Sequence, residues 1–330
     1  MRKGCLIDYN QGLDGTRPCQ EGQGMTNQKE SEGQGMADDD IRIVFPLDVS
    51  TEREATELLD QVAELVDVVK VGLELEKAIG AQKCIELPKR YGKPVFADFK
   101  LKDIPNTVFG AAKNICSYAP TYFNVLADGG KEMAQKAVEA ADLVAEDLGI
   151  ARPKVIAVTV LTSMGFENLV RLGILPAFKT WPEYPYTQWL QNMGVFPKNP
   201  QFPKTDRQKQ AFISHITMLW AEEAMRANVD CLLSSPREAA AIKARWPEVE
   251  LFCPGIRMPD DPPDDQQRTL SPREAVASGV RNLIIGRPIR NQPDRASREA
   301  VIKKIREDAQ KGIGEKPPVI IEEVEEYFLE

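Results

Sequence analysis

Histidine is almost absent from this chain, whose 330 residues include a single one, His215. His215 lies in an apolar stretch with helical periodicity, where we expect a structural role. Catalysis by a histidine-containing triad needs a histidine beside its nucleophile, and most catalytic zinc sites need several histidines. The composition therefore argues against both kinds of site.

Cysteine is also sparse, and its spacing does not match the usual metal-binding patterns. The six cysteines include no CxxC pair, and four of them lie in apolar surroundings: Cys84, Cys116, Cys231 and Cys253. We interpret them as reduced residues of the core rather than as metal ligands or disulfide partners.

Long apolar runs and an excess of positive charge are missing as well. No apolar run approaches the ~18 residues that a membrane-spanning helix needs, and the N-terminus has no apolar signal-peptide core, so we expect a cytoplasmic protein. The net charge of −8 disfavours nonspecific binding to nucleic acid, although it is compatible with a local phosphate pocket.

What the chain does contain is a regular alternation of apolar, β-rich runs and helical patterns from residue 41 onward. Most of the runs are almost continuously apolar, as in parallel strands that are buried on both faces. The expected strands are 41–47, 67–73, 94–99, 121–126, 155–160, 229–234, 249–253 and 282–286, and helices are expected over 51–65, 74–90, 104–118, 130–147, 207–228 and 294–312. Eight such units predict an α/β fold, a TIM (β/α)8 barrel. A doubly wound sheet is the alternative, but no GxGxxG follows the first strand.

Three segments depart from this rhythm. Residues 1–40 are rich in Gly, Gln, Asp and Glu, and we expect a disordered tail there. Met25 and Met36 both precede the first expected strand, so the sequence leaves the translation start open among Met1, Met25 and Met36. Residues 170–206 form an expected insertion after the fifth strand, within a catalytic barrel domain at 41–312. The segment 313–330 is expected to be a C-terminal appendage that ends in an acidic amphipathic helix.

The most informative motif is Asp-x-Lys-x-x-Asp-Ile-Pro-Asn-Thr at residues 98–107. Asp98 and Lys100 are two residues apart, so on a strand they point to the same face. A carboxylate and an ammonium would thus leave the carboxyl end of a barrel strand together, where TIM barrels carry their active sites. The alternative is a surface ion pair, with Asp103 as the N-cap of a helix that begins at Pro105.

A second motif predicts a phosphate site. Gly286 and Arg287 follow an apolar strand, and together they offer backbone amides and a planar guanidinium to a dianion. Residues 258–267, rich in Asp and Pro, are expected to form a closing loop.

Six blocks in order resemble the orotidine 5′-monophosphate decarboxylase family over roughly residues 41–310. They are Phe-Pro-Leu-Asp at 45–48, Val-Lys-Val-Gly at 69–72, the motif at 98–107, Val-Thr-Val-Leu-Thr-Ser at 158–163, Pro-Gly-Ile-Arg at 254–257 followed by Asp-Gln at 265–266, and Ile-Gly-Arg-Pro-Ile at 285–289. The resemblance implies decarboxylation of orotidine 5′-monophosphate to UMP, the last step of UMP synthesis, without a cofactor or a metal.

The resemblance also assigns roles to individual residues. Lys100 would donate a proton to carbon 6 of the pyrimidine, and Asp98 would lie near the departing carboxylate. The substrate-binding residues would be Asp48 and Lys70 at the ribose, Thr162 and Ser163 at the pyrimidine edge, and Arg257, Gln266, Gly286 and Arg287 at the phosphate. For Thr162 and Ser163, ordinary packing at the strand end remains the alternative.

In the family, the residues that match Asp103 and Thr107 reach into the neighbouring subunit's site. The resemblance therefore implies a homodimer with shared active sites, in which Asp103 could also cap its own helix. One departure from the family is Leu126, which stands where members often have a histidine before two glycines. It removes a local polar contact but not the expected proton donor.

Two other functions remain open. A metal-dependent sugar-phosphate decarboxylase or aldolase of the same superfamily would share Asp-x-Lys-x-x-Asp, but not the Ile-Pro-Asn-Thr continuation or the Pro-Gly-Ile-Arg block. A nucleotide-binding relative without catalysis would have no use for the costly cluster of Asp98, Lys100 and Asp103.

Overall fold

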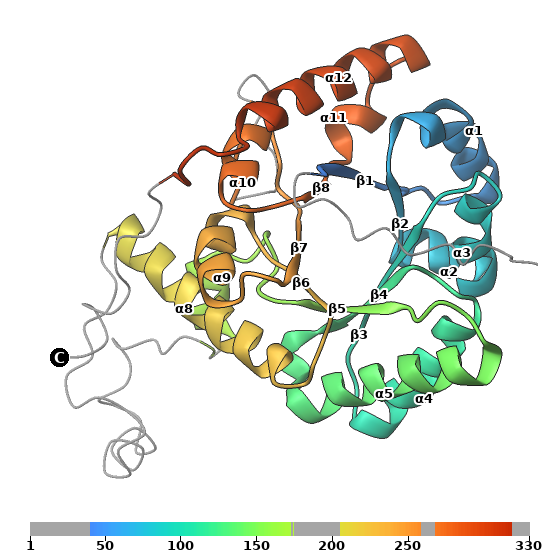
Figure 1. The fold of residues 1–330 in the computed structure, drawn as a ribbon, viewed down its shortest axis with the longest axis horizontal. Helices are drawn as coiled ribbons and strands as arrows, with labels where there is room; N and C mark the ends of the chain where they lie inside the picture. The colour runs from blue at the N-terminus through green and yellow to red at the C-terminus, as the bar shows by residue number, and fades with distance from the viewer. Residues whose placement is uncertain (1–39, 173, 175–204, 259–267, 319–330) are drawn as a thin grey trace, which may run out of the picture. The chain divides into compact units, whose positions relative to one another are not determined.

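A computed structural model describes residues 40–172, 174, 205–258 and 268–318 of the chain. Its centre is a closed barrel of eight parallel strands, in which β1 pairs with both β2 and β8 (Figure 1). The strands are β1 (Arg42–Pro46), β2 (Val68–Gly72), β3 (Val95–Leu101), β4 (Tyr122–Leu126), β5 (Lys154–Val158), β6 (Cys231–Leu233), β7 (Glu250–Cys253) and β8 (Asn282–Ile284). The predicted TIM barrel is confirmed, and each strand lies within or next to its expected range.

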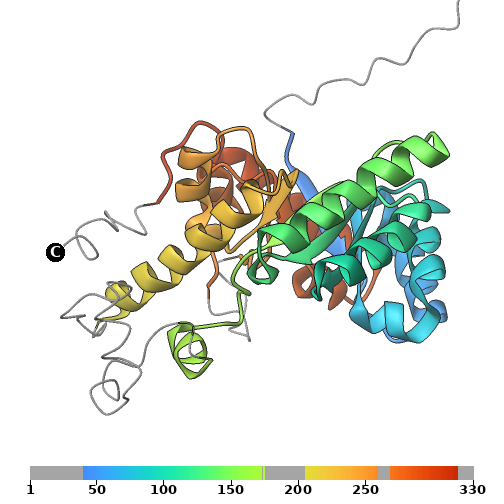
Figure 2. The ribbon, with the colours of Figure 1, turned by 90° about the horizontal axis from the view of Figure 1, so that it is seen from below.

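Helices lie outside the strands, as the two perpendicular views show (Figure 1 and Figure 2). They are α1 (Glu52–Val62), α2 (Leu73–Ile79), α3 (Ala81–Lys89), α4 (Pro105–Ser117), α5 (Lys131–Leu148), α6 (Phe166–Arg171), α8 (Asp206–Met225), α9 (Ala239–Arg245), α10 (Pro272–Ala277), α11 (Arg287–Arg290) and α12 (Arg295–Lys311). The single helix expected over 74–90 was wrong: Gly80, at φ 83°, separates α2 from α3. A residue without a Cβ adopts this conformation at little cost, so the chain can turn there.

Polar side chains begin several of these helices. Thr51 accepts a hydrogen bond from the backbone nitrogen of Glu54 at the start of α1. Thr205 and Gln208 form a reciprocal capping box at the start of α8. Such caps satisfy backbone donors that the helix itself leaves without partners, which explains why the helices begin at these residues.

The interior of the barrel is apolar in the middle and polar at both ends. Phe96, Tyr122 and Phe252 pack together in the middle, with ring centroids 5.0–6.5 Å apart. Because side chains alternate along a strand, the residue two positions after a buried apolar one also points inward. Lys70 follows Val68 and Asp98 follows Phe96 in this way, so both reach the carboxyl end of the barrel.

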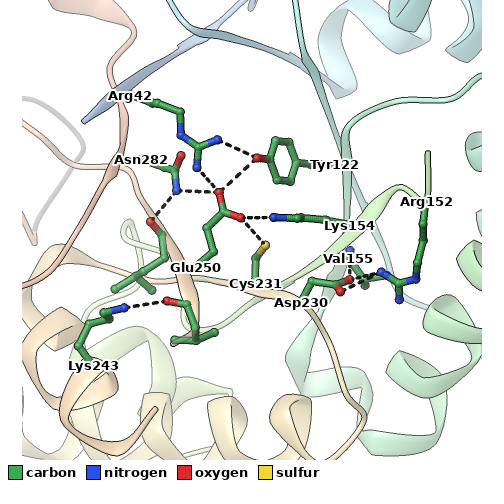
Figure 3. Close-up of polar contacts among 12 residues, drawn as sticks. Arg42, Tyr122, Arg152, Lys154, Val155, Asp230, Cys231, Lys243, Glu250 and Asn282 are labelled. Atoms are coloured by element: carbon green, nitrogen blue, oxygen red, sulfur yellow. Dashed lines mark hydrogen bonds and ion pairs between the residues drawn. The ribbon is translucent and has the colours of Figure 1, made fainter. Parts of the chain in front are cut away.

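The opposite end of the barrel is closed by a cluster around Glu250 (Figure 3). The carboxylate forms an ion pair with Arg42 and accepts from Lys154 at 2.8 Å, and the Tyr122 hydroxyl and the Asn282 amide each donate to it at 3.2 Å. Burial raises the pKa of Glu250, but the hydrogen bond from Lys154 and the charge of Arg42 outweigh it, so the pKa lies below its usual value. These residues begin β1, β4, β5, β7 and β8, so the cluster holds the strand starts together.

Cys84, Cys116, Cys231 and Cys253 are buried and unpaired, as expected for reduced core residues. His215 lies on α8, and burial lowers its pKa. In the described part of the chain, no helix has the length and apolar character needed to cross a membrane.

Several predictions lie outside the described residues: the tail before residue 40, most of the expected insertion, the loop at 259–267 and the helix after residue 318. The domain boundaries and the cytoplasmic location also stay predictions.

Candidate active site

A cavity of about 590 Å³ opens at the carboxyl ends of the strands. It is lined by Pro46, Asp48, Lys70, Glu74, Asp98, Lys100, Val158, Leu161, Thr162, Ser163, Leu233, Pro254, Gly255, Arg257, Ile284, Gly286, Arg287 and Arg290. The fold thus brings nine of the predicted site residues around one space. Asp103 and Thr107 are not among the lining residues, and Gln266 lies outside the described residues.

A chain of alternating charges forms one wall of this cavity. The Asp98 carboxylate lies 2.8 Å from Nζ of Lys70 and 2.7 Å from Nζ of Lys100. Lys70 continues the chain to Asp48 at 3.4 Å. Asp98 is only 5% exposed and Lys70 only 8%, so these charges are stabilised mainly by one another rather than by water.

The surroundings keep Asp98 and Lys70 ionised. Burial acts to raise the pKa of Asp98, but the neighbouring charges of Lys70 and Lys100 outweigh it, so this pKa lies below its ordinary value. Burial acts to lower the pKa of Lys70, and the charges of Asp98 and Asp48 outweigh it in turn, so this pKa is raised. At neutral pH the cavity therefore contains the Asp98 carboxylate paired with the Lys70 ammonium group.

An irregularity in β3 places Asp98 and Lys100. Ala97 pairs with Phe123 and Leu101 pairs with Val125, so residues 98–100 all lie opposite Asn124 alone. Lys100 has a φ of 50°, which is unusual for a residue with a side chain. The two side chains meet because the strand bulges, and not by simple alternation as the sequence suggested; such bulges are frequent next to active sites.

Asn124 connects both ends of this bulge. Its Nδ2 donates to Asp98 at 2.6 Å, and its Oδ1 accepts from the backbone nitrogen of Lys100 at 2.8 Å. The side chain is 1% exposed. Sequence analysis missed Asn124, although an asparagine within the apolar run 121–126 was a signal that could have drawn attention to it.

Asp103 does not cap helix α4. Its Oδ1 accepts from the backbone nitrogen of the next residue, Ile104, at 2.7 Å, and Ile104 occupies the N-cap position without a side-chain cap. Asp103 and Thr107 are both exposed, and Ile104 between them is 68% exposed. The capping role that was considered for Asp103 is therefore wrong.

The expected phosphate end lies at β7 and β8. Gly286 lies after β8, at the N-cap of α11 and beside Pro46, and a Cβ at this position would come within 2.8 Å of the Pro46 ring, so the close approach requires glycine. Arg287 and Arg290 follow on α11, and Arg257 enters the cavity after β7. Sequence analysis missed Arg290, whose Nη1 donates to the carbonyl of Asp48 at 2.7 Å.

Thr162 and Ser163 line the cavity after β5. Glu74, from α2, also lines it and accepts from the Ser50 hydroxyl at 2.5 Å; no sequence pattern had pointed to this residue. Among the described residues, no group of three or more His, Cys, Asp or Glu side chains is arranged to hold a metal ion.

Comparisons with known proteins agree with this geometry. Residues 42–177 match the model of the orotidine 5′-phosphate decarboxylase / HUMPS family. The chain is 34% identical to the orotidine 5′-phosphate decarboxylase of Moorella thermoacetica over 255 residues, which cover 77% of this chain and 87% of that protein. It is 32% identical to the enzyme of the same name from Syntrophomonas wolfei over 249 residues, which cover 75% of this chain and 90% of that protein.

Solved structures show the same fold. The orotidine 5′-phosphate decarboxylase from Lactobacillus acidophilus superposes with a TM-score of 0.59 at 23% identity, over 82% of this chain and 99% of that one. An uncharacterized conserved protein from Geobacillus kaustophilus gives a TM-score of 0.56 at 25% identity, over 81% of this chain and 99% of that one. With curated relatives matched over most of their length, the chain belongs to the orotidine 5′-phosphate decarboxylase family.

Proposed function

We propose that this protein decarboxylates orotidine 5′-monophosphate to UMP with its own side chains. The observation that carries the proposal is the position of Asp98, which is buried between Lys70 and Lys100 at one side of a cavity with Gly286 and Arg287 in its wall. The cluster of Asp98, Lys70 and Lys100 suits charge chemistry on a pyrimidine. Gly286 and Arg287 suit the binding of a phosphate monoester.

Lys100 is the proposed proton donor. The bond between carbon 6 and the substrate carboxylate breaks, carbon dioxide leaves, and the electron pair stays on carbon 6. A proton from Nζ of Lys100 then forms the new C–H bond, and the amine regains a proton from water. The ammonium group stabilises the developing negative charge before it transfers the proton.

Asp98 has two proposed roles. It holds Lys100 in place through the 2.7 Å ion pair, and it lies near the carboxylate that leaves. Two carboxylates ~4 Å apart repel by about 4 kcal/mol at an effective dielectric constant of 20. This is a useful part of the ~8–23 kcal/mol by which enzymes typically lower a barrier.

The remaining cavity residues would bind the rest of the substrate. We assign Asp48 and Lys70 to the ribose, Thr162 and Ser163 to the pyrimidine edge, and the phosphate to Arg257, Gln266, Gly286 and Arg287. Binding of the phosphate away from the reacting carbon would contribute energy that orients the base against Lys100.

We also propose a homodimer with shared active sites. Asp103 and Thr107 are exposed and do not line the cavity of their own subunit, and Ile104 between them is an exposed large apolar side chain. An exposed apolar residue between two exposed polar ones fits an interface in which Asp103 and Thr107 reach the partner's cavity.

The experiment that tests the function is the loss of orotidylate absorbance after addition of purified protein, with and without EDTA. We expect conversion to UMP at the same rate in both samples. Conversion that EDTA abolishes would overturn a reaction carried out by the protein's side chains alone. UMP binding without conversion would favour a nucleotide-binding relative that has lost catalysis.

A further inference from the structure

A buried ion pair behind the cavity wall does not take part in the proposed chemistry. Nη1 of Arg268 lies 3.0 Å from Oε1 of Glu238, and the side chains are 3% and 0% exposed. Glu238 also accepts from Gln210 at 2.8 Å and from Ser214 at 3.1 Å, both on α8. Helix α8 therefore helps to hold Glu238 against Arg268.

Arg268 holds the loop that follows β5. Its Nη2 donates to the carbonyl of Val160 at 2.9 Å and to that of Leu161 at 3.3 Å. These two residues directly precede Thr162 and Ser163 in the cavity wall. The Arg268 guanidinium thus joins this part of the wall to the segment after residue 267.

The backbone next to Arg268 holds the loop that follows β7. Leu270 donates to the carbonyl of Gly255 at 3.2 Å and accepts from the backbone nitrogen of Arg257 at 3.0 Å. Gly255 and Arg257 line the cavity as well, at the proposed phosphate end. The segment 268–270 therefore connects the two loops that would hold the base and the phosphate.

A packing role alone does not explain a charged pair here. Replacement of a buried ion pair by apolar residues of similar volume is often neutral or stabilising, because the desolvation of two charges offsets their attraction. An apolar side chain could not, however, donate to the carbonyls of Val160 and Leu161. The planar guanidinium can bind a carboxylate and backbone oxygens at fixed angles.

We propose that Arg268, held by Glu238, is a positioning residue that sets the Thr162–Ser163 loop against the Gly255–Arg257 loop. It touches no substrate. The consequence is that a nucleotide bound through its phosphate presents its base to Lys100 in the productive orientation. The expected effect on kcat rests on the proposed function. The expected effect on the affinity for nucleotides does not require turnover.

The test compares Arg268→Met and Glu238→Gln with the wild type and with Arg273→Met. Arg273 is a half-exposed arginine on α10 that pairs with Glu315 and lies away from the cavity, so it controls for the loss of an ion-paired arginine. The measurements are the melting temperature, kcat and KM for orotidylate, and the affinities for UMP and for ribose 5-phosphate, which has a phosphate but no base.

We expect Arg268→Met to lower kcat by about 10–100-fold, since a small misplacement of a reacting group can cost that much. It should weaken UMP binding several-fold more than ribose 5-phosphate binding. Glu238→Gln keeps an acceptor for Arg268 and should retain most of the activity. Arg273→Met should match the wild type.

An unchanged kcat, together with an unchanged ratio of the two affinities, would overturn the proposal even if the melting temperature fell. If Arg268→Met does not fold, Glu238→Ala is measured at low temperature instead. The ratio of its affinities for UMP and ribose 5-phosphate then decides whether the proposal holds. If the wild type does not decarboxylate orotidylate, the proposed function fails, and the two affinities still test the positioning role.

Discussion

Asn124 and Lys100 are joined across β4 and β3 by a hydrogen bond of 2.8 Å from the Lys100 backbone nitrogen to the Asn124 side chain. The same amide donates to Asp98. One side chain thus stabilises the positive φ of Lys100 and the orientation of the carboxylate that binds it. The geometry of the proposed proton donor depends on a residue of the neighbouring strand.

We therefore expect Asn124→Ala to lower kcat by about 10–100-fold, because Lys100 would leave its bulged conformation. The variant should also lose about 1–3 kcal/mol of unfolding free energy, since buried groups lose their partners. Steady-state kinetics and urea unfolding measure the two effects. Asn114→Ala, on the exposed side of α4, is the control. A normal kcat in Asn124→Ala would contradict the role of the bulge.

Lys100→Ala should abolish turnover but leave UMP affinity within roughly tenfold, because the ammonium group acts on the reacting carbon rather than on the bound product. Single-turnover assays and calorimetry with UMP separate the two quantities. Lys102→Ala is a matched control, since Lys102 pairs with Asp128 and is not a cavity residue. Retained turnover would remove Lys100 from the mechanism.

Arg287→Ala should weaken UMP binding by about 1.5–3 kcal/mol, the range for a lost hydrogen bond to a charged group. Uridine, which has no phosphate, should bind the variant and the wild type equally well. Arg295→Ala replaces an exposed arginine that pairs with Glu64 and serves as the control. An equal loss of affinity for uridine would show that Arg287 does not act through the phosphate.

Glu250→Gln should destabilise the barrel by about 1.5–3 kcal/mol at pH 7, because hydrogen bonds to a charged group are replaced by neutral ones. The pKa of Glu250 is lowered in the folded protein, so its contribution to stability is present above the unfolded pKa. It is lost as the pH falls through the lower folded pKa. The stability difference between variant and wild type should thus shrink below about pH 4.3.

Urea unfolding of both proteins from pH 3 to pH 7 measures this difference. UMP affinity at pH 7 should be unchanged, since the Glu250 cluster lies at the barrel end opposite the cavity. A difference that stayed constant with pH would show that the charge of Glu250 does not stabilise the fold.

Mixing two inactive variants, Lys100→Ala and Asp103→Ala, tests the shared site. In a dimer that exchanges Asp103, a hybrid contains one site with both wild-type residues and one site with neither. Random exchange of subunits should restore about a quarter of the wild-type activity. Size-exclusion chromatography establishes the dimer first. No recovery after verified exchange would show that Asp103 serves its own subunit.

Local sequence predicted the strands well, because parallel strands buried on both faces need continuous apolar runs. It predicted the helix over 74–90 less well. Apolar periodicity continues through Gly80, but the helical backbone is interrupted there. Among the cavity residues, Asp98, Lys100, Gly286 and Arg287 occur in short motifs at strand ends. Arg290 and Glu74 follow no such motif, so only their neighbours in space reveal them.

The sequence by itself determined the barrel, because it follows from local periodicity, and it showed that opposite charges occur at the end of β3. Tertiary structure decided how that pair is held. The bulge opposite Asn124 and the contact of Arg268 with the β5 loop each join residues distant in the chain. Such contacts depend on how individual side chains and loops that are distant in the sequence meet when the barrel closes, and no local pattern encodes that.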